Sequence, residues 1–182
     1  MEGNIIASNP TWSNGTASIT LSKGANVANN LTIQYQVNGI NENKWTTGTN
    51  VTGLHHNDTV YARLTDGINN GNYASVDIVD NISPTVNISI TSVTSDSIKV
   101  KVTASDGQSG LATSGPYKYY LDNKLKTTTI SNTYTFTSLE ESTTYTLKVT
   151  VADNAGKTTT KSVSAKTESD ETIAEAFNNG TI

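Results

Sequence analysis

Apolar and polar residues alternate along most of this chain with a period of two, as they do in a β-strand that buries one face. The longest run covers 144–151, where the odd-numbered residues are Tyr, Leu or Val and the even-numbered ones are Thr or Lys. Shorter runs with the same alternation lie at 19–21, 31–37, 60–64, 86–90, 98–102 and 133–136. No window before residue 170 shows a convincing helical period. The pattern therefore predicts short strands, each with an aliphatic inner face and a polar outer face.

Turn signals separate these runs at intervals of about ten residues. Examples are Asn-Gly at 14–15, Asp-Gly at 66–67 and Ser-Gly at 109–110. Short alternating strands joined by such turns are typical of antiparallel β-sandwiches of the immunoglobulin type. We therefore expect an all-β fold without a helical layer.

Two stretches of the chain repeat one another, which indicates two copies of one module. The first, TGLHHNDTVYARLTDGINNG, covers 52–71, and the second, TSLEESTTYTLKVTVADNAG, covers 137–156. Their alignment pairs residues of like character: Leu54 with Leu139, Val60 with Tyr145, Leu64 with Val149, and upstream Tyr35 with Tyr119. A module of about 80 to 90 residues is a suitable size for one sandwich.

The boundary between the modules is predicted within VDNISPTV, because Pro84 cannot donate a hydrogen bond to a strand ladder and suits the start of an edge strand. This assigns 1–80 to the first module and 81–168 to the second. The remaining stretch, 169–182, lacks alternation and is interpreted as a tail or the start of a further module.

The segment LEESTTY carries Leu139, Thr143 and Tyr145 at the spacing of a tyrosine corner, and SDSIKVKV at 95–102 looks like a second strand. On these motifs the second half resembles a fibronectin type III module, with Val102 in place of that family's usual core Trp. The resemblance implies two tandem sandwiches in which the Tyr145 hydroxyl bonds to nearby backbone and fixes a turn.

The first half contains PTWSNGTASITLS at 10–22, IQYQVNG at 33–39 and TVYARLTDG at 59–67. In these segments it is similar to bacterial immunoglobulin-like repeats, which occur in strings on surface and secreted proteins. The resemblance implies an extracellular bacterial location and a chain whose partners include other modules of the same parent protein. Sandwiches host many functions, so it does not specify an activity.

Composition narrows the range of partners. The formal charge is −4, and Arg63 is the single arginine, which argues against nucleic acid because phosphate binding needs clustered Lys and Arg. Cysteine is absent, as in many secreted bacterial proteins. The opening residues form no apolar signal segment, and no run is long enough to insert in a membrane. We expect the fragment to be a monomer.

Catalytic residue sets are not apparent, and we expect no enzyme activity. The two histidines, His55 and His56, are adjacent in a turn, where side chains usually point apart and cannot serve one nucleophile or metal. Glu140 and Glu141 occupy the equivalent turn of the second copy and are interpreted as exposed turn charges.

Three aspartates form a candidate metal site. Asp80 precedes the first strand of the second module, while Asp106 and Asp153 lie in loops that meet at the same pole of an immunoglobulin-like sandwich. Carboxylates and loop carbonyls are the hard ligands that calcium prefers, so calcium at the junction of the modules is one hypothesis. The alternative is that each carboxylate bonds to its own turn backbone, as in Asx-turns. No other cofactor is expected.

Several aromatic residues lie off the predicted core faces or in connections and could stack on sugar rings. The glycan candidates are Trp12 and Trp45, with Tyr61, Tyr73 and Tyr120 as further aromatics. The alternative is that they pack at the core or rim of a sandwich, which is where large aromatics are usually found.

Together these patterns favour a non-catalytic spacer, stalk or adhesion segment, with a surface glycan or a host protein as external partner. An accessory carbohydrate-binding module of a secreted glycan-degrading enzyme is the second hypothesis, and it requires an exposed tryptophan beside tyrosines. A structural module of a phage or pilus assembly is the third.

Overall fold

The structure, a computed structural model, describes residues 4–170, and this part of the chain forms fifteen β-strands and no helix. The all-β prediction is therefore confirmed. Two compact units result: the first holds the residues up to Ile82 together with Asp106–Gly110, and the second holds Ser83–Ser105 and the residues from Leu111 onward. The chain first passes from one unit to the other after Ile82. Of the predicted tail, residues 171–182 lie outside the described residues.

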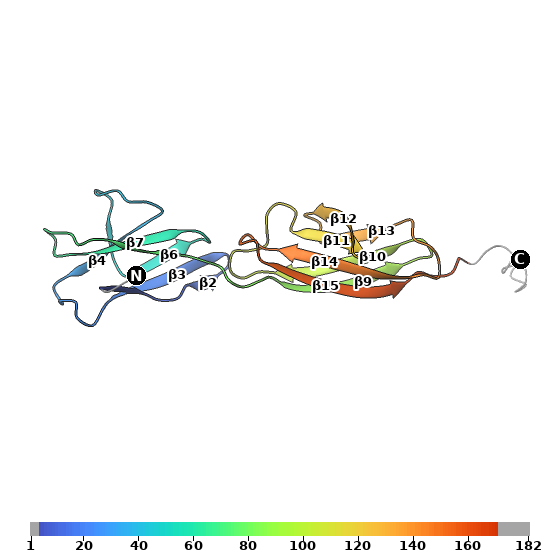
Figure 1. Cartoon of the computed structure of the whole chain (residues 1–182), viewed down its shortest axis with the longest axis horizontal. Helices are drawn as coiled ribbons and strands as arrows, with labels where there is room; N and C mark the ends of the chain where they lie inside the picture. The colour runs from blue at the N-terminus through green and yellow to red at the C-terminus, as the bar shows by residue number, and fades with distance from the viewer. Residues whose placement is uncertain (1–3, 171–182) are drawn as a thin grey trace, which may run out of the picture. The chain divides into compact units, whose positions relative to one another are not determined.

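The first unit opens with a sheet built around one long strand. The strands are β1 (Ile5–Ala7), β2 (Thr11–Ser13), β3 (Thr16–Lys23) and β6 (Asn50–Leu54). Both β1 and β2 pair with one edge of β3, and β6 pairs with its other edge (Figure 1). The interruption between β1 and β2 contains Pro10, which has no N–H to donate to the ladder.

The second sheet of the first unit faces the first across the core. Its order is β5 (Thr46–Thr47), β4 (Thr32–Val37), β7 (Thr59–Thr65) and β8 (Ala74–Asp77). The core between the two sheets consists of Ile5, Ala17, Ile19, Leu21, Ile33, Val51, Leu54, Val60, Ala62 and Ile78. The inward residues of β7 are those that the period-two pattern assigned to the inner face.

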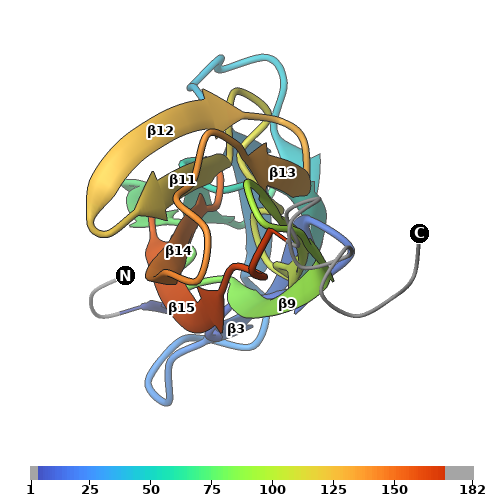
Figure 2. The same ribbon diagram turned by 90° about the vertical axis from the view of Figure 1, so that its right-hand side faces the viewer.

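The second unit contains seven described strands in two sheets. One sheet has the order β13 (Thr133–Phe136), β10 (Ile98–Ser105), β9 (Thr85–Val93), and the other β12 (Lys124–Thr129), β11 (Tyr117–Leu121), β14 (Thr144–Ala152), β15 (Thr158–Lys166). Figure 2 looks along this unit and shows β9 beside β15. Inward Leu147, Val149 and Val151 on β14 have no exposed surface, whereas the Thr and Lys residues between them face outward. With β1 and β2 taken as one interrupted strand, the first unit has the same strand order.

Strand pairing corrects the predicted alignment of the repeats. Tyr35 pairs with Ala62, and Tyr119, its counterpart, pairs with Val149. Val60 therefore corresponds to Leu147 and not to Tyr145, so the sequence alignment was wrong by two residues in this strand. The reason is a longer turn before β14, which similarity of residue type alone does not reveal.

In each unit the chain enters at one pole and leaves at the other. The second unit begins with β9 at Thr85, and its last strand ends beside the far end of β9, where the Glu168 N–H donates to the Thr94 carbonyl at 3.1 Å. In the first unit β1 starts opposite Lys23, while β8 ends opposite Thr59, at the other end of β7. The Lys23 ammonium bonds to the Leu31 carbonyl next to β4, which places Lys23 at the Thr65 end of that sheet.

Candidate functional site

The two histidines have separate partners and form no joint site. His55 Nδ1 lies 3.7 Å from the Asp58 carboxylate, whereas His56 Nδ1 accepts a hydrogen bond of 3.1 Å from the Asp80 N–H. Both are held in the turn between β6 and β7. The geometry supports structural roles for these two side chains.

In the turns after β6 and β13, a side-chain oxygen accepts the backbone N–H that follows the buried leucine, but the accepting side chain differs between the two units. In the second unit the Tyr145 hydroxyl accepts the Glu140 N–H at 2.8 Å, which is the geometry of a tyrosine corner. Thr143, the third residue of that motif, donates its N–H to Thr167 Oγ1 at 3.0 Å, and Leu139 lies in the core. In the first unit the N–H that follows the equivalent leucine is that of His55, and an Asp58 carboxylate oxygen accepts it at 2.6 Å.

Glu140 and Glu141 are exposed, as turn charges commonly are. A Glu141 carboxylate oxygen accepts the Asp170 N–H at 2.6 Å. No nucleophile or acid–base partner for either glutamate is found among the described hydrogen bonds. Their interpretation as turn charges stays a prediction.

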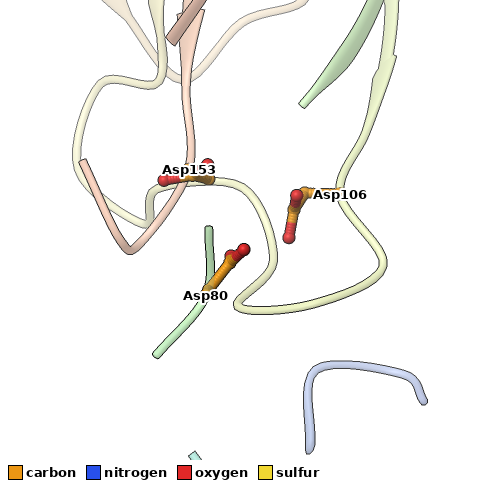
Figure 3. A group of neighbouring side chains, drawn as sticks. All are labelled: Asp80, Asp106 and Asp153. Atoms are coloured by element: carbon orange, nitrogen blue, oxygen red, sulfur yellow. The ribbon is translucent and has the colours of Figure 1, made fainter. Parts of the chain in front are cut away.

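The three aspartates of the candidate metal site lie close together. A carboxylate oxygen from each of Asp80, Asp106 and Asp153 lies within 4.8 Å of the others (Figure 3). Asp80 is fully buried, Asp153 is nearly so, and Asp106 is partly exposed. Asp80 and Asp106 belong to the first unit, and Asp153 belongs to the second.

Each carboxylate also accepts backbone N–H groups. Asp106 Oδ1 accepts from Gln108 at 3.0 Å and Gly110 at 2.8 Å, which folds the loop after β10. Asp153 Oδ1 accepts from Lys157 at 2.7 Å. These bonds have the Asx-turn character of the alternative interpretation.

Asp80 bridges two segments of the first unit. Its carboxylate accepts the Ile82 N–H at 2.9 Å and the Ser109 N–H at 3.0 Å. Burial acts to raise the pKa of Asp80, but the hydrogen bonds from Ser109 and Ile82 and the neighbouring His56 outweigh it and hold the pKa below its usual value.

Calcium binding by the three aspartates stays a prediction. We expect calcium titration into EDTA-treated protein to give a binding isotherm if the cation shares these oxygens, and Asp106→Asn to weaken it. Isothermal titration calorimetry measures this. The absence of heat with the wild-type protein would leave the three carboxylates with turn roles only.

Three of the candidate aromatics gather on the outer face of the β4–β7–β8 sheet. The Tyr61 and Tyr73 rings meet edge to face with centroids 5.8 Å apart, and the Trp45 and Tyr73 rings are tilted with centroids 6.5 Å apart. Tyr73 is 52% exposed, while Tyr61 and Trp45 are half-buried. Burial of a large aromatic on an outer sheet face requires a cover, which here comes from the loop after β4.

Arg63 anchors that loop to the sheet. Its guanidinium lies 4.1 Å from the Trp45 ring centroid, a cation–π contact, and only 6% of the residue is exposed. Arg63 Nη1 lies 2.7 Å from a Glu42 carboxylate oxygen, and Nε donates to Gln34 at 3.0 Å. We call Trp45, Tyr61, Tyr73, Arg63, Glu42 and Gln34 the aromatic–arginine cluster.

Two further hydrogen bonds fix the same loop. Gln36 donates to the Asn41 carbonyl at 2.7 Å and accepts the Asn41 N–H at 2.8 Å. The sequence pointed to the aromatics one by one but missed the roles of Arg63, Glu42 and Gln34. The feature of the sequence that could have indicated these roles was Arg63 itself, the single arginine of the chain, at a strand position that the alternation assigns to the outer face.

The remaining glycan candidates lie apart from this cluster. Trp12 is half-buried on β2 and packs against the core of the first unit. Tyr120, on β11 of the second unit, lies 4.6 Å from the Lys148 ammonium, measured to the ring centroid. A glycan contact by Trp12 stays a prediction, and its position in the core rim agrees with the packing alternative.

We expect the first unit to lose stability in acid. Asp58 and Asp80 both have lowered pKa values: burial of Asp58 acts to raise its pKa, but hydrogen bonds from Asn38 and His55 outweigh it. A carboxylate with a lowered folded-state pKa stabilises the fold above its unfolded value of 3.8, and that contribution is lost as pH falls through the folded-state pKa. Thermal unfolding followed by tryptophan fluorescence from about pH 6 to about pH 2 checks this. A midpoint that does not change over that range would contradict it.

Comparison with solved structures supports the fold. A segment of two fibronectin type III domains from chicken tenascin matches 90% of this chain and 98% of its own length, with a TM-score of 0.54 and 13% identity. Fibronectin(III)-like modules of Clostridium thermocellum CbhA match 90% of this chain and 94% of theirs, with a TM-score of 0.41 and 14% identity. No family model matches the sequence, and no curated protein does. The tenascin match and the strand order of the two units together show the fold of tandem fibronectin type III-like modules.

Proposed function

We propose that this chain is a non-catalytic segment of an extracellular bacterial surface or secreted protein, where it acts as a spacer or stalk, or as part of an adhesin. One observation supports the spacing role most directly: in each unit the chain enters at one pole and leaves at the other. A module of that kind separates the segment that precedes it from the segment that follows it by about the length of its strands. With nine residues in β9, that length is about 30 Å.

The outer surfaces of the strands suit exposure to water. The residues between the core positions of β10 and β14 are Thr and Lys, and on the outer face of β14 and β15 the hydroxyls of Thr150 and Thr160 are hydrogen-bonded at 2.8 Å. Across residues 4–170 no helix has the length and apolar character needed to cross a membrane.

Surface display tests the spacing role. The chain is placed between a wall anchor and a reporter epitope on a bacterium, and epitope access to antibody-coated beads is compared with that of a Gly/Ser linker of about 30 residues, whose root-mean-square length of about 30 Å equals the length of one module. Folded modules resist collapse, so we expect greater access with this chain. Equal access with the flexible linker would contradict a spacing role.

A second candidate function, an accessory carbohydrate-binding module, is favoured by the aromatic–arginine cluster. The hypothesis requires an exposed tryptophan beside tyrosines on one face. Trp45 lies beside Tyr73 and is half-buried, and Tyr73 is the exposed ring of the group. The third hypothesis, a phage or pilus module, has no specific observation in its favour.

A further inference from the structure

We propose that the aromatic–arginine cluster of the first unit, with the cavity beside Tyr73, is a binding site for a neutral polysaccharide. This inference rests on the second candidate function and assigns it a site and a ligand class. It is carried by aromatic rings and fixed polar groups on one face of a sheet, and by a cavity that meets this face at Tyr73.

The cluster is built on rigid elements. In the strand register Tyr61 pairs with Gln36 and with Ser75, and Arg63 pairs with Gln34, so these outward side chains form adjacent rows on three strands. The loop that carries Glu42 and Trp45 is fixed to the same rows by Arg63 and Gln36. A site held in this way loses little conformational entropy when a ligand binds.

Tyr73 connects the rings to a cavity. Its side chain contacts both Trp45 and Tyr61 on the outer face of the sheet. The residue also lines a cavity of about 280 Å³ that opens on the core side of the same sheet, since the inward residues Ile5, Ala62 and Leu64 line it together with Asn4 and Asn72. The connection that carries Tyr73 is held against β7, because the Gly71 N–H donates to the Leu64 carbonyl at 2.9 Å. The cavity is slightly smaller than the roughly 300–1,000 Å³ of drug-sized ligand pockets, which suits a single sugar unit.

The chemistry of the surface fits a saccharide. Sugar rings present apolar C–H faces that pack on aromatic rings, and their hydroxyls need hydrogen-bond partners such as the Asn72 amide and the Glu42 carboxylate, whose side chain is 68% exposed. The Trp45 indole N–H is buried and has no acceptor among residues 4–170.

The charges indicate a neutral ligand. Arg63 is the single arginine of the chain, and its guanidinium is paired with Glu42 and covered by Trp45. An anionic polysaccharide needs several accessible cations, as other polyanions do. A peptide partner would favour a larger apolar patch than one half-exposed tyrosine and two half-buried rings.

Affinity electrophoresis tests the site, using gels that contain hydroxyethylcellulose, galactomannan, arabinoxylan or laminarin, with heparin and polygalacturonate as charged controls. We expect at least one neutral polysaccharide to retard the wild-type chain, and Tyr73→Ala to weaken that affinity by roughly tenfold or more. Tyr120→Ala is the matched control, since Tyr120 lies on the second unit, and it should bind as the wild type does.

A second variant and a second readout keep the test valid even if Tyr73→Ala fails to fold. Asn72 is exposed and lines the cavity, so Asn72→Ala should fold normally and weaken binding by a smaller factor. Titration with a soluble oligosaccharide of the retarding polymer should change the tryptophan fluorescence of the wild type, because Trp45 lies at the site.

The possible results distinguish failure of the assigned site from failure of the carbohydrate-binding function. No retardation of the wild type by any of the polymers overturns both the inference and the carbohydrate-binding function. Retardation only by the charged polymers overturns the inference, because the ligand would then not be neutral. Retardation that Tyr73→Ala and Asn72→Ala leave unchanged overturns the assigned site, while the function itself would survive at another surface. None of these results affects the spacing role, which the display experiment tests separately.

Discussion

Replacing Tyr119 with alanine is expected to destabilise the second unit by about 3–5 kcal/mol, the range for removal of a buried aromatic side chain. Tyr119 has no exposed surface, and its ring stacks on Tyr134 and Tyr117 with centroids 5.2 and 6.4 Å apart. Its hydroxyl donates to the Ser131 carbonyl at 3.1 Å. The alanine variant loses the ring contacts and leaves both a cavity and an unpaired carbonyl.

The two units can be followed separately in this experiment. Both tryptophans, Trp12 and Trp45, lie in the first unit, so tryptophan fluorescence reports that unit, while far-UV circular dichroism reports both. We expect Tyr119→Ala to lower the midpoint of a dichroism transition by at least about 10 °C and to leave the fluorescence transition in place. Tyr120→Ala, at a half-buried outward position on the same strand, is the control and should change little.

Tyr119→Phe separates the ring from its hydroxyl. Burial, with a smaller effect from Tyr117, raises the pKa of Tyr119, so the phenol is neutral and acts only as a hydrogen-bond donor. The phenylalanine variant should cost about 1 kcal/mol, the usual net value of one such bond. If it were as destabilising as the alanine variant, the stacked rings would not be the main source of stability here.

The sandwich could be predicted from the sequence because its determinants are local. Alternation in β10 and β14 fixes which side chains face inward, and a core formed by the inward faces of two sheets follows from that alone. The alignment of Val60 with Tyr145 was wrong for a related reason. Register depends on how many residues the preceding turn contains, and residue similarity is a poor measure of turn length.

The candidate sites were predictable to different degrees. Asp80, Asp106 and Asp153 could be grouped because strand order decides which loops share a pole. The contact of Trp45 with Arg63 could not be foreseen, since it depends on the path of the connection between β4 and β5 and on a cross-strand pair with Gln34. The sequence shows which side chains are available for such a cluster, whereas the loop conformation decides whether they are in contact.

Leu54→Ala is expected to destabilise the first unit by about 2–5 kcal/mol, because a buried leucine leaves a cavity that its surroundings fill only in part. Leu54 is 1% exposed, lies in the core opposite Ala17 on β3, and corresponds to Leu139 in the second unit. Tryptophan fluorescence should show a midpoint lowered by at least about 10 °C.

The matched control is Ile68→Ala, an aliphatic truncation in the same unit at a loop position that is 88% exposed. It should change the unfolding free energy by no more than about 0.5 kcal/mol, because it removes no buried contact. The cores of the two units share no residue, so in the double variant Leu54→Ala, Tyr119→Ala each unit should lose only the stability that its own substitution costs. A fluorescence midpoint lower in the double variant than in Leu54→Ala alone would mean that the two cores do not unfold independently, and the chain would then act as one cooperative module rather than two.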